Sequence, residues 1–376
     1  MRLDRDVRSL REQVYYGQMH VTLYLGGAAV LGLILAVTGW WRPAFGLFGL
    51  RPARMTVDRL GLLVTDPADA SRVNSILANF ARGFNAMISR PSAKAWRVSC
   101  ESLEPLLAPF AHEGAAMGYT LRHLFRYDPF EFERTLVKPR PEMRYLYYVG
   151  LGFWSGIRNH SPAKLERIVD GLDPLHRYLC FDGYGFKRAF FDYPRDPEAL
   201  RVLDALPGYA RNAAYQGVGR AFWFLYMHRP DVLIERMRSL GVHAVDAAAG
   251  AGLAAVFVFP DRLEVAQRLG RHLPAEWRDP FHLGMCFALK ARSINDQDQF
   301  ERWMCSAPAK VREAAYASIR ECDRVELLVR SEPGSDGYRH WRARVTEWMA
   351  GRIEFPMAGI RTTPGVATSH RTPVPA

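Results

Sequence analysis

Three polar residues occupy the same place relative to recurring glycines in the middle of the chain. Glu113, Asp182 and Gln216 each directly precede a glycine, with aromatic residues nearby in the sequence. Burial among apolar side chains disfavours the charged form of a carboxylic acid, so such an acid can keep its proton and donate it. That chemistry would suit protonation of a polyene or of a carbonyl group. We therefore take Glu113 and Asp182 as candidate catalytic acids.

Further polar and aromatic residues stand close to these positions. His112 lies one residue before the first candidate acid, and Arg220 lies four residues after Gln216. The residues expected to line the same pocket or to contact a partner are His112, Gln216, Arg220 and Trp223. In the alternative interpretation Glu113, Asp182 and Gln216 cap helices or form ion pairs with Arg188 and Arg220. Structural ion pairs also shift the pKa of an acid, so they account for the same residues without catalysis.

Signatures for cofactors and metals are missing from the sequence. The Gly-x-Gly pairs, such as Gly150 and Gly152, resemble dinucleotide-binding loops only superficially, because no strand pattern precedes them. The histidines lack the H-E-x-x-H spacing, and the 5 cysteines contain no C-x-x-C pair. We expect neither cofactor nor metal. The odd number and wide spacing of the cysteines indicate reduced, mostly buried thiols.

The glycines recur at nearly fixed spacing. Successive copies are 33 to 36 residues apart, which is typical of stacked two-helix repeats. In most copies a second Gly or Ala follows two residues later, so each helix carries a narrow strip where a neighbouring backbone can approach. Glycine inside a helix costs about 1 kcal/mol relative to alanine, and close packing is expected to offset that cost. The first glycines of the copies are Gly114, Gly150, Gly183, Gly217, Gly250 and Gly284.

A shorter helix is predicted before each glycine helix. Proline beside Ser or Asp, as in Ser161-Pro162, marks its start. We expect these short helices at 163–172, 197–206, 230–240 and 261–269, with degenerate copies around 81–107 and 300–322. The predicted fold class is all-α: an α-solenoid-like array of helical hairpins, about 34 residues per repeat, over residues 47–355. An open superhelix with a concave face is expected, and a closed ring is the alternative.

An apolar stretch near the N-terminus has the length of a membrane span. Residues 21–41 contain no charge, and about 20 apolar residues cross a bilayer core of about 30 Å. We predict a transmembrane helix at 20–42, after a polar segment at 1–19; a signal peptide and a buried or interfacial helix are the alternatives. Membrane lipid is thus a predicted partner. Residues 356–376, rich in Thr and Pro, are predicted to form a disordered tail.

The chain is basic, with a net charge of +11. The charges are scattered and no nucleic-acid-binding module accompanies them, so we expect no nucleic-acid partner. Arginines flank the apolar stretch on both sides and leave its orientation open. Free cysteines favour a repeat domain on the cytoplasmic side of a single-pass membrane protein.

Several segments resemble a known family. APFAHEGAAMGYTLRHLF, LCFDGYGFKRAFF and YQGVGRAFWFL are similar, in order, to the bacterial family known as domain of unknown function 1702, and the resemblance covers roughly Leu47 to Trp348. Genes of that family often neighbour enediyne polyketide clusters. The resemblance therefore implies an accessory role in bacterial secondary metabolism, without agreed catalytic residues. The predicted membrane helix is not part of the family pattern and adds the expectation of a place at the bacterial cytoplasmic membrane. Members often carry His after D-G-x-G-F, where this chain has Lys187, which weakens any role for a histidine acid there.

Three function hypotheses follow. The leading one is a membrane-anchored accessory or scaffold protein of an enediyne-type pathway, whose concave face binds a partner protein or an apolar intermediate. The alternative is an enzyme, a cyclase or isomerase of a lipophilic polyene, with Glu113 or Asp182 as proton donor. A purely structural membrane organiser would have no pocket. A closed, aromatic-lined cavity beside Glu113, Asp182 and Gln216 would favour the enzyme, whereas an open groove there would favour the scaffold.

Overall fold

The computed structural model describes residues 49–89, 93–101, 103–123, 127–332 and 336–349. Every regular element within these ranges is a helix, as the predicted all-α class requires. The predicted polar segment at 1–19, the predicted transmembrane helix at 20–42 and the predicted tail at 356–376 lie outside the described residues.

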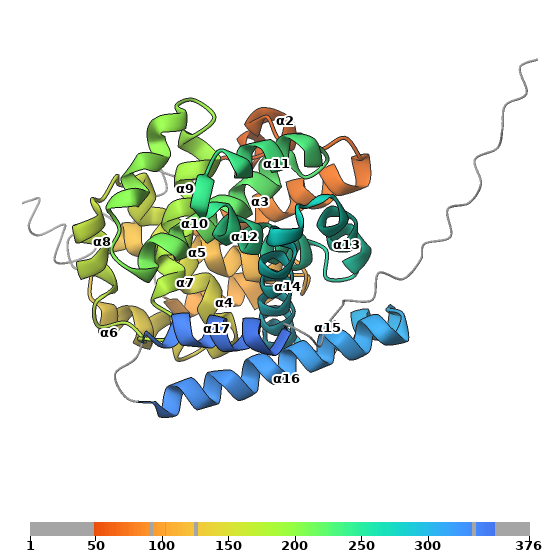
Figure 1. The fold of residues 1–376 in the computed structure, drawn as a ribbon. Helices are drawn as coiled ribbons and strands as arrows, with labels where there is room; N and C mark the ends of the chain where they lie inside the picture. Colours follow the sequence, from red (N-terminus) through yellow and green to blue (C-terminus); the bar gives the residue numbers. More distant parts are fainter. Residues whose placement is uncertain (1–48, 90–92, 102, 124–126, 333–335, 350–376) are drawn as a thin grey trace, which may run out of the picture.

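A continuous array of long helices forms the body of the molecule (Figure 1). Each array helix packs against the next one along the chain. The array helices are α3 (Pro67–Ser89), α5 (Ala108–Arg122), α7 (Arg144–Ile157), α9 (Tyr178–Lys187), α10 (Tyr209–Tyr226), α12 (Ala244–Val258) and α14 (Ala275–Asn295).

Shorter helices connect the array helices, and proline starts several of them as expected. The Ser161 hydroxyl accepts a hydrogen bond from the backbone N–H of Lys164, and so caps α8. Asp261 binds Arg72 instead of capping, and α13 begins at Leu263, two residues later than predicted. The connecting helices are α4 (Ala93–Glu101), α6 (Pro129–Phe132), α8 (Pro162–Val169), the 3₁₀ helix η6 (Pro197–Ala205), α11 (Pro230–Arg238), α13 (Leu263–His272) and α15 (Gln297–Ser306).

Single helical turns complete the chain path. Two of them, η3 and η5, are π-helical and continue α6 and α9 without a break. These turns are η2 (Pro52–Arg54), α2 (Val57–Leu60), η3 (Glu133–Val137), η4 (Pro141–Met143), η5 (Arg188–Asp192) and η7 (Gly241–His243).

The glycines of the array helices lie where two helix backbones touch. A Cβ atom at Gly217 of α10 would lie 1.9 Å from the carbonyl oxygen of Asp182 on the preceding array helix. A Cβ at Gly219 would lie 1.8 Å from the carbonyl oxygen of Ala247 on the following one. No side chain fits at these distances, so the small-residue strip is a backbone contact surface. Equivalent contacts with the preceding array helix occur at Gly114, Gly150, Gly183, Gly250 and Gly284.

The array curves until its first helices meet its later ones. Arg72 of α3 donates two hydrogen bonds, of 2.5 and 2.8 Å, to the Asp261 carboxylate beside α13. Arg292 of α14 donates to the carbonyl oxygen of Leu106, at 3.0 Å, just before α5. These contacts close the curve, whereas we expected an open superhelix with a concave face. The closing residues lie outside the glycine pattern, and therefore the spacing could not reveal them.

Two further helices lie side by side along one end of the array, at the bottom of Figure 1. They are α16 (Ala309–Ser331) and α17 (Gly337–Met349). α17 packs against both α14 and α16, and its Trp341 donates a 2.9 Å hydrogen bond to the carbonyl oxygen of Cys322. The degenerate copy expected at 300–322 corresponds to α15 and the first part of α16. α17 has no counterpart in the repeat pattern, and it covers one end of the interior.

One described helical segment, Gly241–Val258, is long and apolar enough to cross a membrane by length and composition alone. Its mean hydropathy is 1.6 and 67% of it is buried. It packs between α10 and α14, and its apolar character is explained by these neighbours, which cover it on both sides.

Candidate functional site

Three rows of side chains face the interior of the closed array. On α9 and its π-helical continuation η5 they are Asp182, one residue before Gly183, then Phe186 and Phe190, three and seven residues after it. Positions four residues apart share one helix face, which is why the rows run parallel. The sequence analysis used the first row and, from the second row, Arg220. Other interior residues in these rows are Glu113, Val149, Phe153, Arg220, Phe224, Leu253, Phe257, Phe287 and Ala291.

Asp182 lies at the centre of a buried polar cluster. Arg220 donates to its Oδ1, and the Gln216 side-chain amide donates to its Oδ2 at 2.7 Å. The structure thus brings together Asp182, Gln216 and Arg220 as predicted, with Asp182 paired to Arg220 as in the alternative interpretation. Arg188 does not join them, because its guanidinium binds Asp192 at 3.2 Å. With both oxygens engaged, Asp182 is suited to position Arg220.

Glu113, the other candidate acid, is not held by hydrogen bonds from the described residues as Asp182 is. Its nearest cation is Arg220, whose Nη2 lies 3.8 Å from Oε1, and no hydrogen bond from the part of the chain that the structure describes reaches its carboxylate. Burial raises the pKa of Glu113 to about 7; Arg220 opposes this rise and the charge of Asp182 adds to it. A large fraction of Glu113 is therefore protonated near neutral pH. This is the property that the sequence analysis sought in a general acid.

Glu113 borders a cavity of about 50 Å³, here named the phenylalanine cavity. The π-helical turn η5 brings two adjacent aromatic residues, Phe190 and Phe191, to the same wall, and π-helical turns often occur at functional sites. The phenylalanines that line the cavity are Phe80, Phe110, Phe153, Phe186, Phe190, Phe191 and Phe224. An acid thus faces a wall in which phenylalanine rings predominate.

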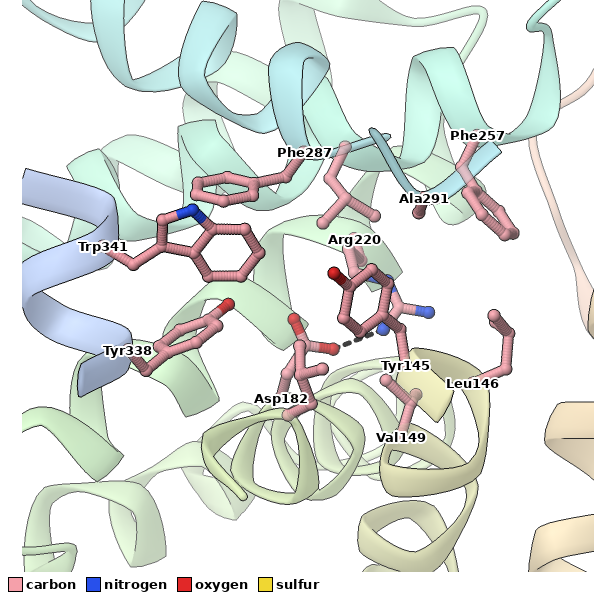
Figure 2. A pocket seen from close by; sticks show the side chains of 12 residues that line it. Tyr145, Leu146, Val149, Asp182, Arg220, Phe257, Phe287, Ala291, Tyr338 and Trp341 are labelled. Atoms are coloured by element: carbon pink, nitrogen blue, oxygen red, sulfur yellow. Dashed lines mark hydrogen bonds and ion pairs between the residues drawn. The ribbon is translucent and has the colours of Figure 1, made fainter. Parts of the chain in front are cut away.

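Arg220 separates this space from a second cavity, here named the α17 cavity, of about 60 Å³. Figure 2 shows Asp182 and Arg220 on one side of it, with Tyr338 and Trp341 of α17 opposite. Each cavity has room for a few water molecules, far below the 300–1,000 Å³ typical of ligand pockets. An organic ligand therefore requires side chains such as Arg220 to move.

α17 also contributes to the polar cluster. Arg342 donates to the Gln216 side-chain oxygen, and the Tyr338 hydroxyl lies 3.4 Å from the Gln216 nitrogen. The Arg342 guanidinium lies 5.7 Å from the centre of the Phe287 ring, a cation–π distance. Gln216 consequently joins α17 to Asp182. Sequence reasoning missed these α17 residues because they lie beyond the glycine repeats.

Of the four predicted pocket residues, Arg220 lines both cavities, whereas Gln216, His112 and Trp223 line neither. Gln216 belongs to the polar cluster, but His112 and Trp223 lie outside it. The Nδ1 atom of His112 lies 2.7 Å from the Tyr147 hydroxyl, and burial lowers the pKa of His112 to about 3. Trp223 is 1% exposed and packs edge-on against Phe224 and Phe259. Both residues fall outside the three interior rows and therefore face neighbouring helices. The lowered pKa favours the neutral form of His112, which suits its contact with Tyr147.

None of the 5 cysteines forms a disulfide bond, and four of them are buried, in agreement with the predicted mostly buried thiols. Cys305 on α15 is the exposed one. Over residues 49–349, apart from the gaps given above, no three His, Cys, Asp or Glu side chains are grouped as a metal ion would need.

The comparisons with known proteins identify the family. No curated protein and no solved structure matches the chain significantly. A family model described as "Protein of unknown function (DUF1702)" matches residues 44–349. This span contains all of the array helices, α17 and both cavities. The chain is therefore a member of the DUF1702 family.

Proposed function

We propose that the protein binds an apolar, unsaturated small molecule in its aromatic interior, and that Glu113 protonates it. The observation that carries this proposal is the Glu113 carboxyl group, which is buried, free of hydrogen bonds from the described residues, and adjacent to a wall of phenylalanines. The reaction class is a redox-neutral isomerisation or cyclisation.

The chain's own residues supply each part of such a reaction. The carboxyl proton of Glu113 moves to one carbon of a double bond, and a carbocation remains on the substrate. Aromatic faces stabilise a nearby cation, here through rings such as Phe153 and Phe186. Arg220, 3.8 Å away, stabilises the carboxylate that is left, and Asp182 holds Arg220 in place. Return of a proton from another carbon to Glu113 completes the reaction without any oxidant or reductant.

An accessory role without catalysis is the second candidate. The family resemblance implies a bacterial, enediyne-type pathway, and the protein would hold an apolar intermediate there as a membrane-anchored component. The observation that favours this role is the small volume of the two cavities, about 50 and 60 Å³, which suits retention better than rapid turnover. A partner protein would have to bind the outer surface, because the closed array has no open concave face.

The test is deletion of the gene in its host, followed by complementation and comparative metabolite profiling. Glu113→Gln keeps the size and the neutral state of the protonated acid while removing the proton. The proposed enzyme predicts that wild type restores the metabolite and Glu113→Gln does not. Full restoration by Glu113→Gln would leave the accessory role, and an unchanged metabolite profile in the deletion strain would reject both.

A further inference from the structure

The phenylalanine cavity has an apolar rim. Of its lining residues, Met55, Leu77 and Phe191 are partly exposed, whereas all the others are buried. The rim therefore marks the place where the cavity approaches the surface. Met55 lies in residues 49–62, the segment that contains η2 and α2, and backbone N–H groups of this segment are hydrogen-bonded to α3.

Two side-chain hydrogen bonds anchor this segment. The backbone N–H groups of Leu50 and Val57 donate, each at 2.8 Å, to the Asn85 and Asn74 side-chain oxygens of α3. The rim is thus held in a defined place over the first array helix, at the end of the molecule opposite α16 (Figure 1).

Exposed arginines flank the rim. Arg51, Arg54 and Arg59 are exposed on this segment, where Asp58 is the one acidic residue between 49 and 62. Arg82 is exposed on α3, and it borders the same surface groove as Pro52. Arginines near a membrane attract anionic headgroups, with about 1 kcal/mol per residue near the surface. An apolar opening with a basic border matches the chemistry of an anionic bilayer surface.

The chain length brings this surface close to a membrane. The uncharged stretch of residues 21–41, for which we predict a membrane span, ends eight residues before Gly49. Eight residues reach at most about 28 Å. We infer that the rim of the phenylalanine cavity docks on an anionic lipid bilayer, so that an apolar ligand passes from the bilayer between Met55, Leu77 and Phe191. The ligand route rests on the proposed function, whereas the docking surface does not.

The test places a fluorescent probe on the rim in the full chain, reconstituted in nanodiscs. Met55→Cys is labelled in a Cys305→Ser background, which removes the exposed thiol. Arg51→Cys repeats the measurement at an exposed position, and Leu327→Cys on α16, 71% exposed, is the control at the opposite end. Quenching by lipids that carry a spin label then reports the proximity of each probe to the bilayer.

We expect several-fold stronger quenching at Met55 and Arg51 than at Leu327 in discs that contain phosphatidylglycerol. The double change Arg54→Glu and Arg59→Glu should reduce that quenching in anionic discs and leave it unchanged in phosphatidylcholine discs. Equal quenching at both ends, or quenching that ignores lipid charge, would overturn the inference. Strong quenching combined with full metabolite output from Glu113→Gln would reject the proposed catalysis while the docking surface stands.

Discussion

Replacement of Gly217 by alanine tests the backbone contact between α9 and α10. The new Cβ would lie 1.9 Å from the Asp182 carbonyl oxygen, whereas real Cβ contacts stay above 3.0 Å. The two helices must therefore move apart by at least 1.1 Å, the difference between these two distances. A gap of about 1 Å removes a quarter to a half of the dispersion energy of each atom pair across it. Overpacking of this kind lowers the free energy of unfolding by about 1–3 kcal/mol. The same movement displaces the Asp182–Arg220 pair.

Gly270→Ala on α13 is the matched control. Its Cβ would meet nothing closer than 3.5 Å, and alanine stabilises a helix by up to about 1 kcal/mol relative to glycine. Thermal unfolding of the full chain, followed by circular dichroism in one detergent, should give a Tm several degrees below wild type for Gly217→Ala, at roughly 2–4 °C per kcal/mol. For Gly270→Ala it should be equal or higher. Equal Tm values for the two variants would show that the backbone contact does not exist.

Three further outcomes are expected. The pKa of Glu113 is raised from 4.5 to about 7, so between these pH values the folded state holds a proton that the unfolded state has lost. The free energy of unfolding should therefore fall by up to about 3 kcal/mol as pH rises from 4.5 to 7. In denaturant unfolding, Glu113→Gln should lack this dependence on pH. Cys305 alone should react rapidly with a thiol reagent under native conditions, as peptide mass spectrometry would show, and modification of Cys100 at a similar rate would contradict the burial pattern. Arg292→Met should lower the unfolding free energy by about 3 kcal/mol or more, since the Phe257 and Leu106 carbonyl oxygens lose a charged donor. Arg302→Met, on the exposed face of α15, should change it little, and equal effects would refute the idea that Arg292 helps to close the array.

Local patterns along the chain predicted much of the helical framework. The proline and capping signals placed the short helices within a few residues, because a missing N–H and a side-chain acceptor act within one turn. The glycine spacing placed the backbone contacts correctly, since each contact uses the same position on successive helices. The row of Glu113, Asp182 and Gln216 contained real interior residues for the same reason.

The remaining features depend on contacts between distant segments. Arg72 with Asp261, and Arg342 with Gln216, join residues more than a hundred positions apart, and no periodicity connects them. The same limit explains why the open superhelix was preferred to the closed ring, and why the contribution of α17 was not expected. His112 was selected by its proximity to Glu113 in sequence, although adjacent helical residues point in different directions.

Direct titration of Glu113 tests the central claim. Infrared difference spectroscopy of the full chain resolves the C=O stretch of a protonated carboxylic acid, and comparison with Glu113→Gln assigns the band. We predict a band that is present at pH 6, titrates near pH 7 and is absent from the variant. A band that disappears with a midpoint near 4.5, or that persists in Glu113→Gln, would contradict a protonated acid in the phenylalanine cavity.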